Sequence, residues 1–374
     1  MQIHRFLPRE RFQTLLDELS REGYEIMGPQ VREHAVVFAP LSRVEQLPVG
    51  IRDTQSPGNY RLEQTGSQRC FDWAVGPLAI KPITFPGREA LWHSEPQADG
   101  SLHFEAHPIT SQPTAIIGVR ACDLAGLLVH DHHFMHGGSH EHKYRDPYYI
   151  ARRKDLLLIA VHCTHPASTC FCAATGDGPR ARYGFDIALS ELDEGFIVEA
   201  HTERGAAIMN KLDTLEATPE QFADADAAIK EAAQKQQRGL PHTDIPAMLL
   251  KAMEHPRWNE VAQRCLACGN CTAVCPTCFC QTNVEEVAPD GARTTHYRQW
   301  ETCFDPQHSY IHGITIRAER PHRYRQWLTH KFGTWVEQYG RSGCVGCGRC
   351  ITWCPVGIDV TEELAALNKE PVNG

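Results

Sequence analysis

Two copies of one cysteine pattern near the C-terminus constrain this chain more than any other feature. Residues 265–276 read Cys-x2-Cys-x2-Cys-x3-Cys-Pro, and residues 344–355 repeat the same spacing. In this arrangement, which is that of bacterial ferredoxins, three thiolates on a tight loop bind one [4Fe-4S] cluster, and the fourth thiolate binds the partner cluster. The sequence therefore predicts two neighbouring clusters that exchange their fourth ligands.

This exchange assigns four cysteines to each cluster. The first set comprises Cys265, Cys268, Cys271 and Cys354, and the second set comprises Cys344, Cys347, Cys350 and Cys275. Zinc is the alternative metal, because Cys-x2-Cys pairs also form tetrahedral zinc sites, usually as two pairs separated by a longer loop. Three cysteines at three-residue intervals followed by Cys-Pro, twice over, favour iron–sulfur clusters.

Composition limits the class of protein. The chain of 374 residues is long enough for two domains, and its 16 cysteines are expected to be metal ligands, because the N-terminus lacks the apolar segment of a signal peptide. No apolar stretch is long enough for a transmembrane helix. The formal net charge of −9 argues against a nucleic-acid binder. We therefore expect a cytoplasmic protein that binds neither membrane nor nucleic acid.

Hydrophobic patterning predicts an α/β N-terminal domain over residues 1–240, followed by an α-helical two-cluster ferredoxin-like domain over residues 241–374. Short apolar runs, typical of buried strands, are expected to form a parallel core; they lie at residues 35–38, 114–119, 155–161, 186–189 and 196–199. Helical spacing occurs at residues 9–21, 124–134, 218–239, 248–265 and 320–339. From His242 onward no strand is expected.

Four further cysteines predict a third metal site in the first domain. Cys122 and Cys163 each follow an expected strand, and Cys170 and Cys172 lie in the loop just beyond. Ligands bind at the carboxyl ends of the strands in open α/β sheets, so the four thiols converge on a third [4Fe-4S] cluster if the two strands are neighbours. Zinc and buried free thiols are the alternatives. Asp123 is a possible substitute ligand.

The remaining cysteines have no assigned partner. Cys278, Cys280 and Cys303 lie beside the first motif, where they either pack near a cluster and tune its potential or simply fill space. Cys70 stands alone. The tract of six histidines within residues 130–142 is interpreted as a solvated loop, because no carboxylate or cysteine spacing completes a defined metal site.

The order of these motifs is similar to that of a known family. The relevant segments are Gly118-Val-Arg-Ala-Cys-Asp123, Asp146-Pro-Tyr-Tyr149 with Arg152-Arg153, Cys170-Phe-Cys172, Cys275-Pro-Thr-Cys-Phe-Cys280 and Cys344-Val-Gly-Cys-Gly-Arg-Cys350. Over residues 110–374 the chain resembles the β subunit of cytosolic NAD(P)-linked [NiFe] hydrogenases, also called sulfhydrogenases. It equally resembles the A subunit of anaerobic sulfite reductase, a member of the same family.

The resemblance implies a non-catalytic electron-transfer subunit. Its expected partners are a flavin subunit that carries FAD and binds NAD(P), and the small and large subunits of a [NiFe] hydrogenase. The corresponding component of an anaerobic sulfite reductase complex is the alternative within the family, and a zinc protein that only scaffolds a complex is the alternative outside it. The residues themselves agree with a relay, because no flavin or pyridine-nucleotide fingerprint accompanies the cysteine motifs.

Overall fold

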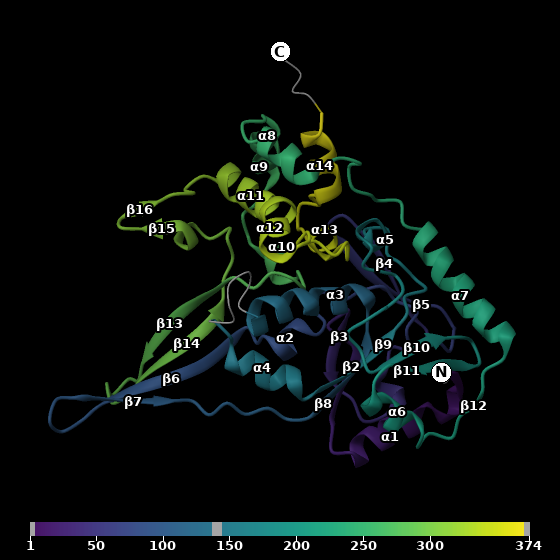
Figure 1. Ribbon diagram of the computed structural model, residues 1–374. Helices are drawn as coiled ribbons and strands as arrows, with labels where there is room; N and C mark the ends of the chain where they lie inside the picture. Colours follow the sequence, from purple (N-terminus) through teal and green to yellow (C-terminus); the bar gives the residue numbers. More distant parts are fainter. Residues whose placement is uncertain (1–3, 137–143, 370–374) are drawn as a thin grey trace.

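The computed structural model describes residues 4–136 and 144–369, and its largest element is an eight-stranded sheet (Figure 1). The strand order is β12-β1-β11-β10-β9-β8-β2-β3, with β2, β8, β9 and β10 parallel. The parallel core expected from the sequence is therefore present. The strands are β1 (His4–Pro8), β2 (Glu25–Arg32), β3 (Ala35–Pro40), β8 (Thr114–Val119), β9 (Leu156–Val161), β10 (Ile187–Glu191), β11 (Gly195–Ala200) and β12 (Leu215–Glu216).

Both faces of this sheet are covered by apolar side chains, which is why β8 and β9 read as continuous hydrophobic runs. Along β9, Leu157, Ile159 and Val161 pack into one core, and the alternate residues Leu156 and Leu158 pack into another. The first core is closed by α1 (Phe12–Arg21) and α6 (Glu203–Met209), and the second by α2 (Lys81–Thr84), α3 (Ala121–His130) and α4 (Pro147–Lys154).

A second sheet joins distant parts of the chain. Its order is β13-β14-β6-β7, formed by β6 (Arg88–Pro96), β7 (Leu102–Ala106), β13 (Gln281–Val287) and β14 (Thr294–Trp300). Figure 1 shows these strands extending to one side of the molecule. The expectation of no strand after His242 is therefore wrong. The polar sequences of β13 and β14 lack the apolar alternation of a half-buried strand, and their pairing with β6 depends on a partner far away in sequence.

The C-terminal region is otherwise mostly helical. The segment expected as one helix from residue 248 is two helices, α8 (Ile245–Lys251) and α9 (Arg257–Arg264), because Pro256 cannot continue a helix. Residues 320–339 are helical throughout, as expected, with a π-helical turn (His330–Thr334) between α11 (Arg320–Thr329) and α12 (Trp335–Tyr339). The other helices here are α10 (Asn270–Ala273), α13 (Arg349–Thr352) and α14 (Val360–Leu367).

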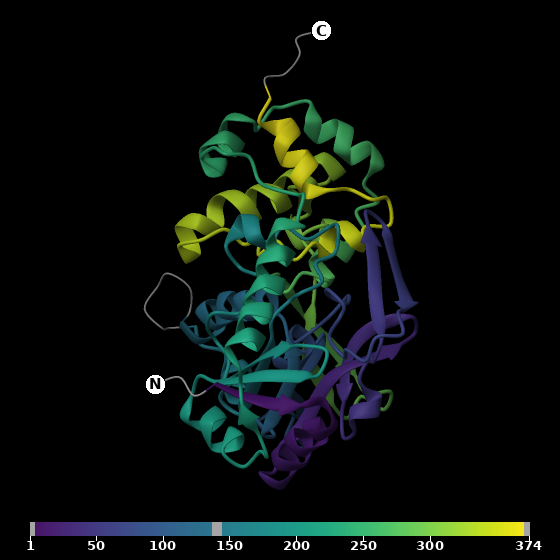
Figure 2. The same ribbon diagram turned by 90° about the vertical axis from the view of Figure 1, so that its right-hand side faces the viewer.

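The helix α7 (Pro219–Gln234) connects the large sheet to this helical region, and Figure 2 shows it in front of the sheet. It begins with a capping box between Thr218 and Gln221. Shorter elements are α5 (Cys172–Thr175) and two hairpins, β4 (Ile51–Ser56) with β5 (Asn59–Gln64) and β15 (Tyr310–Ile311) with β16 (Ile314–Thr315). Among the described residues, no helix combines the length and the apolar character needed to cross a membrane.

Candidate iron–sulfur cluster sites

The first set of cysteines lines one cavity in the helical region. Cys265 follows α9, Cys271 lies in α10, and Cys354 follows α13 of the second motif. Together with Cys268 they line one cavity. The structure thus brings a cysteine of the second motif into the loop of the first.

The two motifs have the same local conformation. Gly269 and Gly348 adopt left-handed φ values of 73° and 76° and cap the short helices α10 and α13, which pack against each other. In both motifs the backbone N–H two residues after the first cysteine donates to that cysteine's Sγ at 3.4 Å. Such N–H···S contacts are among the features that set cluster potentials.

The thiols of the second set lie close to one another, and Cys350 among them is part of α13. Burial raises the pKa of the Cys350 thiol well above its ordinary value, and the nearby thiols of Cys344, Cys347 and Cys275 raise it further. Four buried thiols so close to one another are costly as free thiolates. A bound metal removes this cost, because metal ligation holds cysteines deprotonated.

A buried lysine faces the second set. The Lys331 Nζ, on a side chain only 4 % exposed, donates to the Sγ atoms of Cys275 at 3.3 Å and Cys278 at 3.4 Å, and to the Thr277 Oγ1 at 3.0 Å. In the part of the chain that the structure describes, no carboxylate forms an ion pair with it. A buried ammonium requires a compensating negative charge, and thiolates bound to an iron–sulfur cluster supply one.

The four cysteines of the expected third site also meet. The strands β8 and β9 are parallel neighbours, so the segments after them lie at the same edge of the sheet. A single cavity is lined by Cys122, Cys163, Cys170 and Cys172. Burial, followed by the neighbouring thiols of Cys172 and Cys163, raises the pKa of Cys170 well above its ordinary value. The donor set therefore suits a cluster held by four thiolates.

Asp123 has a different neighbour. Its Oδ1 lies 2.8 Å from the Nη1 of Arg349, and both side chains are buried. This ion pair joins α3 to α13. The carboxylate is thus engaged by an arginine, and four thiols without it already line the cavity.

A buried arginine forms part of the third cavity wall. Arg120, only 2 % exposed, donates through its guanidinium to the carbonyl oxygens of Phe71 at 2.8 Å and Ala74 at 3.2 Å. Within the described residues it forms no ion pair with a carboxylate. Its charge, like that of Lys331, is thus available to offset the negative charge of thiolates.

The third cavity adjoins the second set. Cys347 also lines this cavity, and the Gly346 carbonyl accepts a hydrogen bond from the Phe171 N–H at 2.8 Å. A Cβ added at Gly346 would lie 2.6 Å from the backbone of Cys172, so only glycine permits this approach. On the other side, Cys350 lines the cavity of the first set. The second set is therefore the middle of three.

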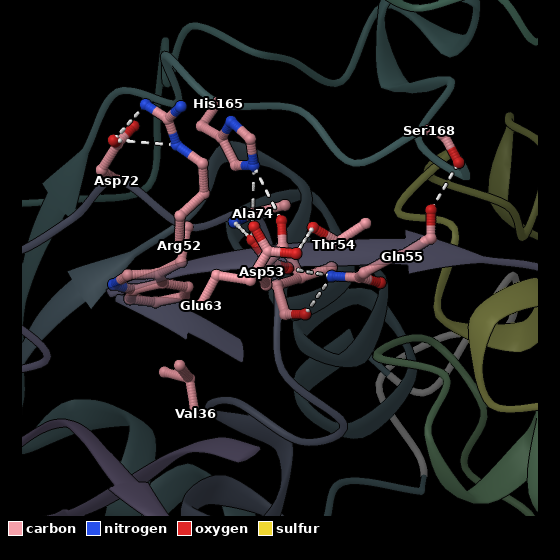
Figure 3. A network of polar contacts seen from close by, with 12 residues as sticks. Val36, Arg52, Asp53, Thr54, Gln55, Glu63, Asp72, Ala74, His165 and Ser168 are labelled. Atoms are coloured by element: carbon pink, nitrogen blue, oxygen red, sulfur yellow. Dashed lines mark hydrogen bonds and ion pairs between the residues drawn. The ribbon is translucent and has the colours of Figure 1, made fainter. Parts of the chain in front are cut away.

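A polar network braces the loop that carries Cys163 and Cys170 (Figure 3). The buried Asp53 accepts from the Ala74 N–H at 2.8 Å, and its backbone carbonyl lies 3.0 Å from the His165 Nε2. Gln55 receives a bond from Ser168 on its carbonyl and from Thr352 of α13 on its side chain. The β4–β5 hairpin thus ties the third cavity to the second motif.

The arrangement differs from that of a mononuclear zinc site. Such a site holds its ligands around one ion. Within residues 4–136 and 144–369, no three His, Cys, Asp or Glu side chains converge in this way.

The histidine tract is only partly a loop. His130 ends α3 and is buried, and His133, in the following π-helical turn, stacks on the Phe279 ring at 3.6 Å. The interpretation of the whole tract as solvated is therefore wrong for its first residues, since their helical spacing continues that of α3. Residues 137–143 lie outside the described part of the chain.

Sequence reasoning missed the buried cations. Nothing in the sequence distinguishes three of these basic residues, Lys331, Arg120 and Lys81, from ordinary ones. Only Arg120 lies near a candidate cysteine, two residues before Cys122. Their proximity to thiols arises from packing. Cys70 is buried against Arg9, whose Nη1 donates to its Sγ at 3.7 Å.

Comparison with known proteins agrees with this geometry. Residues 264–358 match a family model described as a 4Fe-4S dicluster domain, so the C-terminal part of this mixed α/β chain is a domain for [4Fe-4S] clusters. The chain is also similar to the protein named sulfhydrogenase 2 subunit beta of Pyrococcus furiosus. The two are 30% identical over 317 residues, which cover 82% of this chain and 88% of that protein.

Proposed function

Because the chain belongs to the sulfhydrogenase β-subunit family, we propose that it is the iron–sulfur electron-transfer subunit of a multi-subunit hydrogenase. When bound, [4Fe-4S] clusters supply one-electron redox chemistry, with potentials set by charge, hydrogen bonds to sulfur and exposure. The chain's own residues hold the clusters, exclude water and fix the local charge.

Twelve cysteines are the proposed ligands. The first cluster is held by Cys265, Cys268, Cys271 and Cys354, the second by Cys344, Cys347, Cys350 and Cys275, and the third by Cys122, Cys163, Cys170 and Cys172. The shared cavities of the first and third sets support these assignments, as do the neighbouring thiols of the second. Asp123 is not a ligand in this proposal, because Arg349 engages it.

One observation in particular supports an electron relay through the three sets of cysteines. The second set contributes Cys347 to the wall of the third cavity and Cys350 to the wall of the first cavity. Clusters held by the three sets would thus lie in the order third, second, first, with no intervening element. Such a series has two ends, and a relay between two partner subunits requires two ends.

The partners follow from the same proposal. A flavin subunit carrying FAD exchanges electrons with NAD(P)H at one end, and the small and large subunits of a [NiFe] hydrogenase lie at the other. An anaerobic sulfite reductase would use the same relay with a different catalytic component. Affinity purification from native cells separates the two, since co-purified nickel indicates hydrogenase and co-purified sirohaem indicates sulfite reductase.

Metal analysis of the anaerobically purified chain tests the clusters themselves. Three clusters give about twelve irons per chain and two give about eight. In Cys170→Ser we expect about four irons fewer and the loss of one set of electron paramagnetic resonance signals, because a third-set ligand is removed. The matched control is Cys70→Ser, which changes a buried cysteine outside all three sets and should leave the iron count unchanged.

The result that contradicts the third cluster is about eight irons in both the unmodified chain and Cys170→Ser. Stoichiometric zinc in a colourless protein would contradict all three clusters and favour a scaffold. Asp123→Asn should retain all the iron. A loss of about four irons in that variant would mean that the carboxylate is a ligand after all.

A further inference from the structure

Two buried hydrogen-bond donors line the cavity of the first cysteine set. The side chains of Tyr324 and Trp327 are only 2 % and 4 % exposed, and both line this cavity together with the four cysteines. Among the described residues, neither the Tyr324 hydroxyl nor the Trp327 Nε1 has a hydrogen-bond partner. A buried donor normally has one, because it loses its hydrogen bonds to water when the protein folds. These two groups therefore indicate that an acceptor belongs in the cavity.

One helix positions both donors. Tyr324 and Trp327 are three residues apart in α11, so their side chains share one face of this helix. That face belongs to the hydrophobic core of the helical region, which includes Cys265, and Cys271 and Cys350 pack against the same core. The centroids of the two aromatic rings lie 5.5 Å apart. Packing thus holds the two donors beside cysteines of the first and second sets.

The rest of the cavity wall gives these donors little to bind. Apart from the cysteines, the wall consists mostly of apolar side chains and backbone, and its other polar side chain, Asn270, donates to the Trp353 carbonyl. The acceptors that remain are sulfur atoms, either of the cysteines or of a cluster that they bind. Two unpaired donors facing four thiols suit an iron–sulfur cluster, because its sulfur atoms accept hydrogen bonds.

Both groups keep the proton that they would donate. Burial raises the pKa of the Tyr324 hydroxyl well above its ordinary value, and the nearby charges of Glu363 and Cys271 raise it further. The indole N–H of Trp327 is a donor only. The two groups are therefore donors in either oxidation state of a bound cluster.

The first cavity differs from the surroundings of the other two sets. The ammonium of Lys331 lies beside the second set, and Arg120 forms part of the third cavity wall. Of the described residues that line the first cavity, none is a lysine or an arginine. Two neutral donors stand there in place of a cation. In an apolar wall such donors stabilise added negative charge more strongly than they would in water.

We propose that the Tyr324 hydroxyl and the Trp327 indole N–H donate hydrogen bonds to sulfur atoms of the first cluster and thereby raise its reduction potential. This role rests on the proposed function, because it requires a cluster held by the first set. A hydrogen bond to sulfur strengthens when the cluster gains an electron, since the acceptor becomes more negative. Cys268 is the one exposed cysteine of the chain, so the first cluster lies nearest the exterior. A raised potential there favours electrons at the end of the series that a partner can reach.

Redox titration of the full-length chain, purified anaerobically with its iron and followed by electron paramagnetic resonance, tests each donor. Tyr324→Phe removes only the hydroxyl, and Trp327→Phe removes the indole N–H. In each variant we expect one midpoint potential to become more negative. Reduction of that cluster should become about tenfold less favourable, which is about 59 mV for one electron. The iron count should equal that of the unmodified chain.

Two matched controls remove the same groups where an acceptor is present. The Tyr148 hydroxyl donates to the Leu91 carbonyl at 2.9 Å, and the Trp258 Nε1 donates to the Ala252 carbonyl at 2.7 Å. Neither side chain lines the first cavity. Tyr148→Phe and Trp258→Phe should therefore lower stability without moving any midpoint potential.

A second measurement starts from the unmodified chain. The protein is labelled with tryptophan that carries ¹⁵N at the indole nitrogen, and the reduced form is studied by electron–nuclear double resonance. We expect a ¹⁵N nucleus coupled to the spin of a cluster. The coupling should disappear in Trp327→Phe and persist in Trp258→Phe.

Three results would overturn the proposal. One is that either variant, Tyr324→Phe or Trp327→Phe, keeps both its iron and its midpoint potentials. Another is that the ¹⁵N coupling is absent from the unmodified chain or survives Trp327→Phe, since another indole would then be its source. The third is that either variant loses iron, because the donor would then be needed to hold the cluster and not to set its potential. A low iron count in the unmodified chain would instead contradict the proposed clusters themselves.

Discussion

Replacement of Lys331 by methionine should lower the reduction potential of the cluster for which Cys275 is a proposed ligand. The side chain is buried, and its Nζ lies 3.3 Å from the Cys275 Sγ. Burial alone would lower the pKa of Lys331, but the thiols of Cys275, Cys278 and Cys344, as thiolates, outweigh burial and raise that pKa well above its ordinary value. The ammonium is therefore charged, and it would stabilise the reduced, more negative state of a cluster bound beside it.

The magnitude follows from Coulomb's law. An electron added to the cluster is spread over atoms beyond the Cys275 sulfur, so its mean separation from the ammonium is taken as about 6 Å. With an effective dielectric constant of about 20, the interaction is about 3 kcal/mol, or about 120 mV for one electron. Methionine keeps the apolar length of the side chain and removes its charge. We expect one midpoint potential to become more negative by roughly 100 mV.

The assay is a redox titration of the anaerobic protein followed by electron paramagnetic resonance. Lys230→Met is the control, because Lys230 is 73% exposed on α7 and its charge is screened by water. The reasoning is refuted if the midpoints of Lys331→Met equal those of the control while the iron count is unchanged. A positive shift would refute it as well, since removal of a cation cannot favour reduction through this interaction.

Three further changes probe the packing around the sites. Gly346→Ala should lower the free energy of unfolding by at least about 2 kcal/mol, because the added Cβ collides with backbone and the positive φ is strained. Gly291→Ala is the control and should cost less, because Gly291 also has a positive φ but a Cβ there meets nothing within 4 Å. Equal losses of unfolding free energy in denaturant titrations would contradict the collision at Gly346. Arg349→Met should cost about 3–5 kcal/mol in the same assay because it leaves the Asp123 carboxylate buried and unpaired, and an unchanged unfolding midpoint would disprove this pair's role. Burial, with Lys81 and the neighbouring histidine, lowers the pKa of His130 from 6.5 to about 3. Below pH 6.5 the unfolded chain binds a proton that the folded chain does not, so stability should fall toward pH 3 by about 1.4 kcal/mol per pH unit; His130→Phe should show a shallower pH dependence, and identical slopes would argue against a buried neutral imidazole.

The spacing of the cysteines within each motif was enough to predict the two-cluster region from the sequence. Three cysteines at three-residue intervals followed by Cys-Pro allow one arrangement of thiols around a cubane, and each motif requires a fourth thiol from its copy. Cys354 accordingly lies in the cavity of the first motif. Two strands, Thr114–Val119 and Leu156–Val161, could also be predicted from the sequence, because strands buried on both faces contain little but apolar residues.

Only the tertiary structure decided which distant groups meet. The pairing of β14 with β6 leaves no periodic pattern in the sequence. The convergence of Cys122 and Cys163 with Cys170 and Cys172 could be anticipated only on the condition that β8 and β9 were neighbours. The sheet order met that condition.

The tertiary structure likewise decided which charged side chains lie beside the thiols. Lys331 is 56 residues from Cys275 in sequence, and the Asp123–Arg349 pair joins α3 to the much later helix α13. A basic residue in sequence is normally solvated, and its burial depends on what packs around it. Local spacing could therefore predict which sulfurs are candidate iron ligands, whereas the electrostatic surroundings of those sulfurs arose from long-range packing.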